Sequence, residues 1–308
     1  MKCPNRTWER RIPLVQWCAL AVSLTLQCHI SLAAEPIVLA GPAMGTTYRV
    51  TLAASVPGLS RGEVHRELER ALTRIDQGCS TWRDDSDVSR FNRSKAHAWI
   101  DVGTDLAEIV VIARDVHAET AGVFDITVSP LVTLWRDAIE RHKEPSPEEL
   151  IETRARIGMP LVEVRQNPDG TAALRKLRAG VQLDLGGIGP GYAVDCLGER
   201  LVELGSTHHL VTLGGEARAW GTQADGNPWT VHVHLKAAPH PPDVIELCAG
   251  DAVAFSTRRP GRSPVDVRTG RPCEAPAATV MFRSSRCSHA DAWAVAIALG
   301  AGPHDHEK

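Results

Sequence analysis

A glycine-rich turn is the segment of this sequence best suited to hold an anion. Residues 183–195 read LDLGGIGPGYAVD, an apolar strand-like run that passes through glycines into a helical pattern. Backbone N–H groups and the positive end of a helix dipole favour a phosphate at such a turn. Close packing of strand and helix is the competing interpretation. The spacing matches neither the G-x-G-x-x-G fingerprint nor a P-loop, so Rossmann and P-loop nucleotide sites are disfavoured.

The histidine and cysteine patterns are weaker evidence for a functional site than the glycine-rich turn is. His232 and His234 alternate along an expected strand, but two histidines alone bind metal poorly, and an exposed strand face explains them better. The five cysteines beyond residue 34 include no C-x-x-C pair. A Cys273–Cys287 disulfide is conceivable in an oxidising compartment, but buried free thiols are the commoner explanation.

The composition is that of a globular protein with many loops. Of the 308 residues, 43 % are hydrophobic and 23 % are charged, and the chain holds 25 Gly and 20 Pro. The formal net charge is −3, and removal of residues 1–34, which carry +3, changes it to −6. A net negative charge argues against general nucleic-acid binding.

Residues 1–33 have the pattern of a secretory signal peptide. Basic side chains between residues 2 and 11 precede an apolar run over residues 12–26, and small residues suited to cleavage follow. We therefore expect a cleaved leader and a periplasmic mature chain, residues 34–308. An uncleaved membrane anchor is the competing interpretation, although polar residues make the apolar run short for a span.

Helices and strands that would position the glycine turn follow each other irregularly. Ser60 and Glu63 form a capping-box pattern before a helix whose apolar face holds Val64, Leu68, Leu72 and Ile75. Further helices are expected over residues 105–119, after Ser129, after Ser146, over residues 190–204, and in a segment ending near Leu299. Strand-like runs cover residues 46–53, 161–164, 181–183, 210–213, 229–235, 244–247 and 278–282. This order is neither a regular βαβ alternation nor a β-sandwich, and it predicts an α+β fold.

Several separate blocks resemble the FAD:protein FMN transferases of the ApbE family, in the order that the family has them. The most specific blocks are residues 124–135, FDITVSPLVTLW, and residues 184–195 in the glycine turn. The other blocks are residues 43–48, 80–92, 213–216, 266–270 and 278–292. The resemblance implies that residues 34–308 form one domain of mixed sheets flanked by helices.

The resemblance also implies an activity and a flavin site. FMN would be transferred from FAD, through its phosphate, to a Thr or Ser of a target redox protein, a flavoprotein subunit of a membrane redox complex, with release of AMP and assistance from Mg²⁺. Family contacts to FAD carry over to Met44, Trp82, Val123, Phe124, Asp125, Gly186, Tyr192 and Val265. Plain alternatives remain: Met44 and Phe124 as core side chains, Trp82 as a packing aromatic, and Asp125 as the cap of a turn.

The metal site that the resemblance implies is incomplete. Its ligands carry over to the backbone carbonyl of Gly189 and the side chain of Asp291, and Asp291 and Asp266 are the candidate catalytic acids. The family's Thr ligand is Val295 here, and Ala294 stands where some members have a second Asp, so Mg²⁺ affinity is expected to fall. Asp291 also has a local explanation, because Ser288 three residues earlier completes a capping-box pattern.

Two more departures lie near the expected chemistry, and they leave the function open between three hypotheses. Ser263 stands close to where the family commonly has a His, and Pro190 replaces a Lys or an acid in the glycine turn, where the first helical position tolerates it. The first hypothesis is an FMN transferase with a weakened metal site. The others are a non-catalytic FAD-binding carrier and an FAD pyrophosphatase that releases FMN and AMP.

Overall fold

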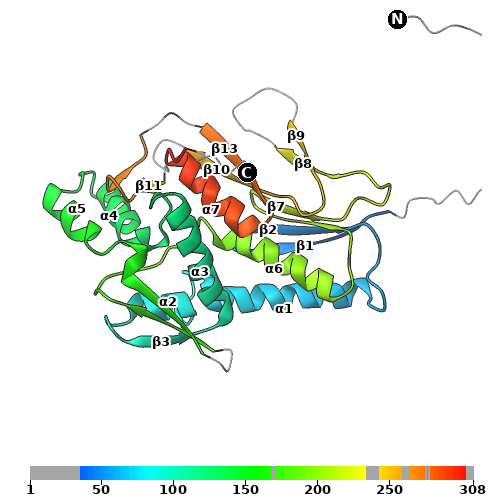
Figure 1. Cartoon of the computed structure of the whole chain (residues 1–308), viewed down its shortest axis with the longest axis horizontal. Helices are drawn as coiled ribbons and strands as arrows, with labels where there is room; N and C mark the ends of the chain where they lie inside the picture. The colour runs from blue at the N-terminus through cyan, green and yellow to red at the C-terminus, as the bar shows by residue number, and fades with distance from the viewer. Residues whose placement is uncertain are drawn as a thin grey trace, which may run out of the picture. The chain divides into compact units, whose positions relative to one another are not determined.

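The core of the fold is a six-stranded antiparallel sheet with the order β1-β2-β6-β7-β10-β13 (Figure 1). The computed structural model describes residues 35–167, 171–233, 243–258, 264–274, 276 and 278–302. The strands of this sheet are β1 Ile37–Ala43, β2 Thr46–Leu52, β6 His209–Leu213, β7 Glu216–Trp220, β10 Ala252–Arg258 and β13 Ala278–Ser284. Because β2 pairs directly with β6, the first hairpin and the last third of the chain form one sheet.

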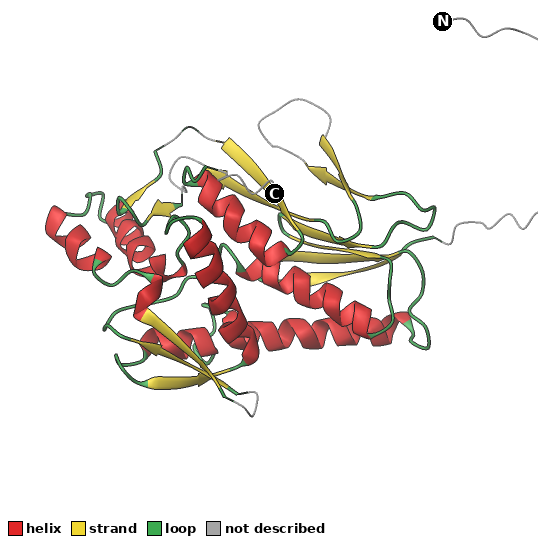
Figure 2. Cartoon of the chain, viewed as in Figure 1, coloured by secondary structure: helices red, strands yellow, loops and turns green. Residues whose placement is uncertain are grey.

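Two helices, α6 Gly189–Glu203 and α7 Cys287–Ala298, cover one face of this sheet (Figure 2). Helix α1 Arg61–Cys79 packs on α6, and α3 Thr104–Glu119 packs on α7. The other helices are α2 Asp87–Arg93, α4 Ser129–Glu140 and α5 Pro147–Arg154, with 3₁₀ helices at Ile126–Val128 and Met159–Leu161. The contact between α6 and α7 brings the glycine turn against the last helix of the chain.

Three smaller sheets complete the fold. They are the β3-β5-β4 sheet, the β8-β9 hairpin and the β11-β12 hairpin, and each described pairing is antiparallel. Their strands are β3 Trp99–Val102, β4 Val162–Gln166, β5 Ala172–Lys176, β8 Trp229–Val233, β9 Asp243–Leu247, β11 Val265–Asp266 and β12 Arg271–Pro272. Sheets and flanking helices in one unit confirm the α+β class.

Local capping explains where two of the expected helices begin. The Ser60 hydroxyl accepts the Glu63 N–H, and Glu63 Oε2 accepts the Ser60 N–H at 2.8 Å, a complete capping box for α1. Ser146 and Glu149 repeat this arrangement at α5. Both capping boxes were predictable because they need only four consecutive residues.

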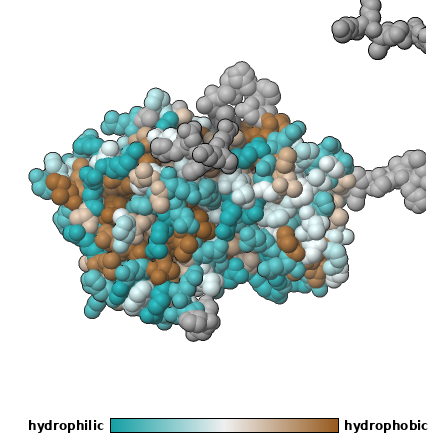
Figure 3. Space-filling view, viewed as in Figure 1, coloured by the Kyte–Doolittle hydropathy of each residue, from teal (hydrophilic) through white to brown (hydrophobic). Residues whose placement is uncertain are grey.

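The surface of the face drawn in Figure 3 is mostly hydrophilic, with apolar groups gathered toward the α4–α5 end.

Strand β7 turns alternate side chains to the two faces of the large sheet. Ala217 and Ala219 pack with Trp229 and Leu247 of the β8-β9 hairpin. The residues between them face α6 instead, because Arg218 pairs with an α6 carboxylate and the Trp220 ring lies against α6. By the same period of two, Glu216 lies on the helix-covered face. Strand alternation thus brings an acidic side chain under the two helices.

One expected strand is wrong, and the cysteines are free thiols rather than a Cys273–Cys287 disulfide. Residues 181–183 have no ladder partner in the described structure, because the Leu183 N–H donates to Asn92 Oδ1 at 2.7 Å and Asn92 Nδ2 donates to the Leu183 carbonyl at 3.0 Å. A side-chain amide therefore replaces a neighbouring strand. The five described cysteines are all free, and the Cys287 thiol instead points at two main-chain carbonyls.

Some expectations concern parts of the chain that the structure does not describe. The leader over residues 1–33, His234 and Ser263 lie outside the described residues. None of the described helices combines the length and the apolar character that a bilayer crossing needs.

Acid is expected to destabilise the fold through His209. This side chain is fully buried, stacks on the Trp220 ring at 4.7 Å between centroids, and has its pKa lowered to about 4 by burial. The unfolded chain takes up the proton near pH 6.5, so stability is present above that pH and is lost as pH falls toward 4, by about 2 kcal/mol between pH 7 and 4.5. Urea unfolding of wild type and His209→Asn at both pH values measures this loss. Equal pH dependence in the two proteins would contradict it.

Candidate functional site

A cavity of about 490 Å³ lies between α1, α4 and the glycine turn. Its wall combines hydroxyl groups, one Arg and the apolar start of the turn, a mixture suited to a ligand with an aromatic part and an anionic part. The lining residues are Met44, Asp76, Cys79, Ser80, Thr81, Trp82, Ser129, Val132, Thr133, Arg136, Leu183, Asp184, Leu185, Gly186, Gly189 and Pro190. The structure therefore brings together four residues predicted from the sequence: Met44, Trp82, Gly186 and Gly189.

Trp82 stands free at this cavity. Its side chain is 97 % exposed, the most exposed of the large apolar side chains that the structure describes. An indole held in water without packing gains stability only when another flat group covers it. Met44 lines the same cavity from the β1–β2 turn, where its φ of 48° is a strained value for a residue with a side chain. Trp82 is thus no packing aromatic, and Met44 is held in place by its backbone.

The glycine turn is tightly tied by its own hydrogen bonds. The Gly186 N–H donates to Asp184 Oδ1 at 2.8 Å, and the Gly189 N–H donates to the Leu185 carbonyl at 2.7 Å. Helix α6 then starts at Gly189 with Pro190 in its first turn, as the first helical positions allow. Several glycine N–H groups that looked free in the sequence are therefore already used. The helix dipole, the hydroxyl groups and Arg136 are what the turn and its surroundings offer to a phosphate.

Two buried carboxylates lie beside the first turn of α6. Asp291 Oδ2 accepts the Gly191 N–H at 3.1 Å, and burial raises the pKa of Asp291. Burial and the charge of Asp291 raise the pKa of Glu216, whose Oε2 also accepts the Gly215 N–H at 3.0 Å. Among the described residues, no Lys, Arg or His forms an ion pair with either acid. Burial thus favours the neutral form of both acids, and a divalent cation would stabilise their ionised forms.

Glu216 is a site residue that the sequence reasoning missed. It belongs to a Gly-Gly-Glu hairpin turn, where a polar residue is unremarkable, and only its presence in a block that resembles the ApbE family pointed to it. No group of three His, Cys, Asp or Glu side chains lies close enough to hold a metal ion in the described part of the chain. A cation here would therefore need main-chain oxygen and ligand oxygen besides the two carboxylates.

Val295 faces the glycine turn, as the placement of the metal-ligand helix predicts. A Cβ built on Gly187 would lie 2.9 Å from Val295 Cγ2 and 3.5 Å from Phe124 Cε2. Val295 therefore lies beside the glycine turn, where its side chain presents carbon and no oxygen. Phe124 and its neighbour Val123 are buried beneath the turn, so both act first as packing side chains.

Restoring that oxygen is expected to strengthen Mg²⁺ binding. Val295→Thr keeps the shape of the side chain and places a hydroxyl beside the turn, and we expect about a tenfold gain in Mg²⁺ affinity, comparable to the effect of other metal-site contacts. Calorimetric titration of the FAD-loaded protein with Mg²⁺ measures it. Val295→Ala, which removes bulk without adding oxygen, is the control. If Thr and Ala variants bind Mg²⁺ alike, the placement of this helix at the metal is wrong.

Seven expected site residues lie away from the cavity lining in the described structure: besides Val123, Phe124 and Asp291, they are Asp125, Tyr192, Val265 and Asp266. Asp125 caps the 3₁₀ helix that follows it, because its Oδ1 accepts the N–H of Thr127 at 2.7 Å. The Tyr192 hydroxyl faces Asp105 of α3 at 2.9 Å. Asp266 pairs with Arg268 at 2.9 Å in the turn between β11 and β12, and Val265 is buried beside it. Each side chain has a structural role here, and their contacts to FAD or to reacting atoms stay predictions.

The capping-box interpretation of Asp291 is wrong. Helix α7 begins at Cys287, so Ser288 is already inside its first turn. The N–H groups of Cys287 and Ser288 donate to Asp195 of α6, each at 2.9 Å. Asp291 therefore does not cap its own helix, and its Oδ2 instead accepts the Gly191 N–H in the first turn of α6. An acceptor distant in sequence cannot be read from a local pattern.

Known proteins match this chain over most of its described length. The sequence pattern of the ApbE family matches residues 44–305. The FAD:protein FMN transferase of Haemophilus influenzae is 34 % identical over 64 % of this chain and 58 % of that protein, and its Escherichia coli K12 counterpart is 31 % identical over 85 % and 77 %. The apo structure of the Pseudomonas stutzeri flavinyl transferase ApbE superposes with a TM-score of 0.75 at 32 % identity, covering 86 % of this chain and 84 % of that chain. Because these matches extend over most of both chains, the protein belongs to the ApbE family.

Proposed function

We propose that this chain is an FAD:protein FMN transferase that works with Mg²⁺. The observation that carries the proposal is the cavity itself, which joins an unpacked indole, Trp82, to the glycine turn at the start of α6. A flavin nucleotide has both parts that this arrangement suits, a flat ring system and a pyrophosphate. The relatives described above are named for this activity.

The chain's own residues would bind and orient FAD in this cavity. Trp82 offers its ring face to the isoalloxazine or the adenine. The start of α6 and the Arg136 side chain, which also lines the cavity, would hold the pyrophosphate oxygens. Hydroxyl groups from Ser80, Thr81, Ser129 and Thr133 line the same cavity and can donate to phosphate or ribose. Fixing the phosphate between helix and Arg leaves its phosphorus open to an acceptor hydroxyl.

Mg²⁺ fits the donor set beside the turn. Asp291 and Glu216 are buried carboxylates with raised pKa values and no described cationic partner, and the Gly189 carbonyl belongs to the same turn. These three groups would hold the ion, with substrate phosphate and water completing the oxygen shell. When bound, Mg²⁺ would neutralise phosphate charge and polarise the phosphorus. Glu216 thus offers one oxygen donor that partly offsets the one missing at Val295.

Incubating the purified protein with FAD, Mg²⁺ and a peptide holding an acceptor Thr tests the proposal. Covalently flavinylated peptide and AMP in equal amounts are expected. AMP without labelled peptide would favour a pyrophosphatase, and tightly held FAD without AMP would favour a carrier. Omission of Mg²⁺ and addition of a chelator are the controls, and activity that persists in the chelator would remove the metal from the proposal.

We infer a periplasmic location and a membrane-associated target for the same activity. The basic and apolar leader over residues 1–33 supports export, and FMN attachment to a Thr or Ser suits a flavoprotein subunit of a membrane redox complex. Cell fractionation of the producing strain, followed by in-gel flavin fluorescence of membrane proteins with and without the gene, tests both points. Protein found only in the cytoplasm would contradict export.

Replacing Trp82 is expected to weaken FAD binding without affecting stability. Loss of one stacked ring lowers binding by about 1–3 kcal/mol, so Trp82→Ala should raise the Kd for FAD about tenfold or more. Because the indole is 97 % exposed, the melting temperature should stay at the wild-type value. Flavin fluorescence titration gives the Kd. Ile151→Ala, at an exposed apolar site on α5, is the control, and an unchanged Kd for Trp82→Ala would place the flavin elsewhere.

A further inference from the structure

The N-terminal turns of α6 and α7 meet in unusually close contact. A Cβ built on Gly191 would overlap the Cys287 carbonyl oxygen and would lie 2.8 Å from the Cβ of Asp291. Real side chains almost never approach so closely, so glycine alone permits this crossing. The contact places the first turn of α7, which carries Asp291, directly against the first turn of α6, which would face the phosphates of FAD.

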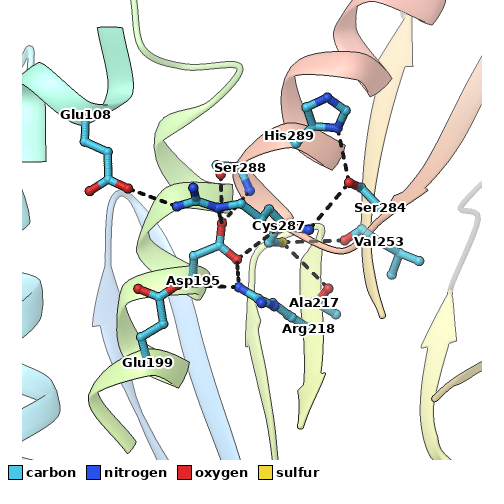
Figure 4. Close-up of polar contacts among 11 residues, drawn as sticks. Glu108, Asp195, Glu199, Ala217, Arg218, Val253, Ser284, Cys287, Ser288 and His289 are labelled. Carbon is cyan, nitrogen blue, oxygen red and sulfur yellow. Dashed lines mark hydrogen bonds and ion pairs between the residues drawn. The ribbon is translucent and has the colours of Figure 1, made fainter. Parts of the chain in front are cut away.

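Each of the two helices supplies an acid to the other helix's first turn. Asp291 stands four residues after Cys287 in α7, and its Oδ2 accepts the Gly191 N–H of α6. Asp195 stands four residues after Gly191 in α6, and it accepts two N–H groups and one hydroxyl from α7. Figure 4 shows Asp195 with Cys287, Ser288 and Arg218 converging on its carboxylate. The two acids form a reciprocal pair, one turn into each helix.

Asp195 is buried and has hydrogen-bond partners on α7 and on β7. Its side chain is 1 % exposed, and Arg218 Nη1 from β7 contacts Oδ1 at 2.6 Å. Arg286 at 4.0 Å adds a second positive charge, with Glu199 and Glu108 balancing the two arginines from α6 and α3. Arg218 also fixes the acid to the sheet. The carboxylate therefore ties α6, α7 and β7 at one point.

We propose that Asp195 is a positioning residue for the metal end of the site. It fixes the first turn of α7 against α6, and this sets the distance between Asp291 and the glycine turn. Asp195 touches neither the cavity lining nor Asp291 in the described hydrogen bonds, so it acts through the main chain of α7. The inference deepens the proposed function and rests on it for the role of Mg²⁺.

Asp195→Asn tests the proposal because it keeps the size of the side chain and replaces one acceptor oxygen by a donor. That amide would face an N–H group of α7 or the Arg218 guanidinium. We expect Mg²⁺ affinity in the FAD complex to fall about tenfold, as for other residues that orient metal ligands. The KM for FAD should change less than the Mg²⁺ affinity, because none of the described hydrogen-bond partners of Asp195 lines the cavity. Ser288→Ala, which removes one of the hydrogen bonds to Asp195, should give a smaller loss and keeps the test valid if Asp195→Asn folds poorly.

Ser60→Ala is the matched control. It weakens the N-terminal cap of α1, and the hydrogen bonds of this cap involve no residue of α6 or α7. Hydrogen exchange of the metal-free protein provides a second readout that does not depend on the enzymatic function. Asp195→Asn should speed exchange over residues 189–193 as well as 287–291, whereas Ser60→Ala should leave both segments at wild-type rates. Faster exchange at residues 287–291 alone, with wild-type Mg²⁺ affinity, would overturn the proposal. A wild-type protein that neither binds Mg²⁺ nor releases AMP would defeat the proposed function, and the exchange data would still judge the coupling between the helices.

Discussion

Asp291→Asn is expected to lower Mg²⁺-dependent AMP release from FAD about a thousandfold, because loss of a metal-held charge in a buried site costs about 4 kcal/mol of transition-state stabilisation. The folded protein should meanwhile keep or gain stability. Burial raises the pKa of Asp291, so the ionised carboxylate is unfavourable there without a cation. An asparagine oxygen can still accept the Gly191 N–H. Single-turnover AMP release and urea unfolding of the metal-free protein measure the two effects.

Asp266→Asn separates the two candidate catalytic acids. Asp266 is buried and its carboxylate is engaged by Arg268, so its loss should cost some stability and change turnover only a few-fold. A thousandfold loss in Asp266→Asn with normal turnover in Asp291→Asn would exchange their roles. Equal losses in both variants would mean that both acids take part in the reaction.

Most helices, and with them the fold class, were predictable because the sequence signals of a helix are local. The capping box at Ser60, the helix start after Ser146 and the apolar spacing of α1 each involve a few neighbouring residues, and the structure confirms them. The cap of α7 was not predictable in this way. Its acceptor, Asp195, lies about ninety residues earlier in the chain, and the nearby Ser288 imitates a local cap. A local pattern predicts a helix cap correctly only where no residue distant in sequence supplies a better hydrogen-bond acceptor.

The candidate site shows the same division. Trp82 and Gly189 line the cavity as the resemblance implied, because sequence blocks preserve which residues border a ligand. Glu216 was missed, since its place under α6 follows from strand alternation and from the order of strands in the sheet. Asp125 was expected at the flavin, whereas its visible work is to cap a 3₁₀ helix. Resemblance identifies positions, and only packing shows which neighbours each position has.

The second large effect is expected at Gly191, where any side chain would force the two helices apart. The obstacle is main chain, the Cys287 carbonyl, together with the Asp291 Cβ at 2.8 Å, and neither can rotate away. Gly191→Ala should therefore lower the free energy of unfolding by about 3 kcal/mol, the upper end of the usual cost of overpacking. It should also weaken Mg²⁺ binding, because Asp291 moves with α7. Urea unfolding and Mg²⁺ titration of the same preparation report both.

Gly62→Ala provides the matched control for a glycine-to-alanine change in a helix. Gly62 is exposed in α1, and the nearest atom to a Cβ there is the end of the Arg66 side chain at 3.7 Å. That variant should gain about 0.5–1 kcal/mol from the better helix propensity of alanine. The sign of the effect thus reverses between two glycines that look alike in the sequence. If Gly191→Ala instead unfolds at the wild-type urea concentration, α6 and α7 do not meet as closely as this geometry requires, and the link from Asp195 to the metal end loses its mechanical basis.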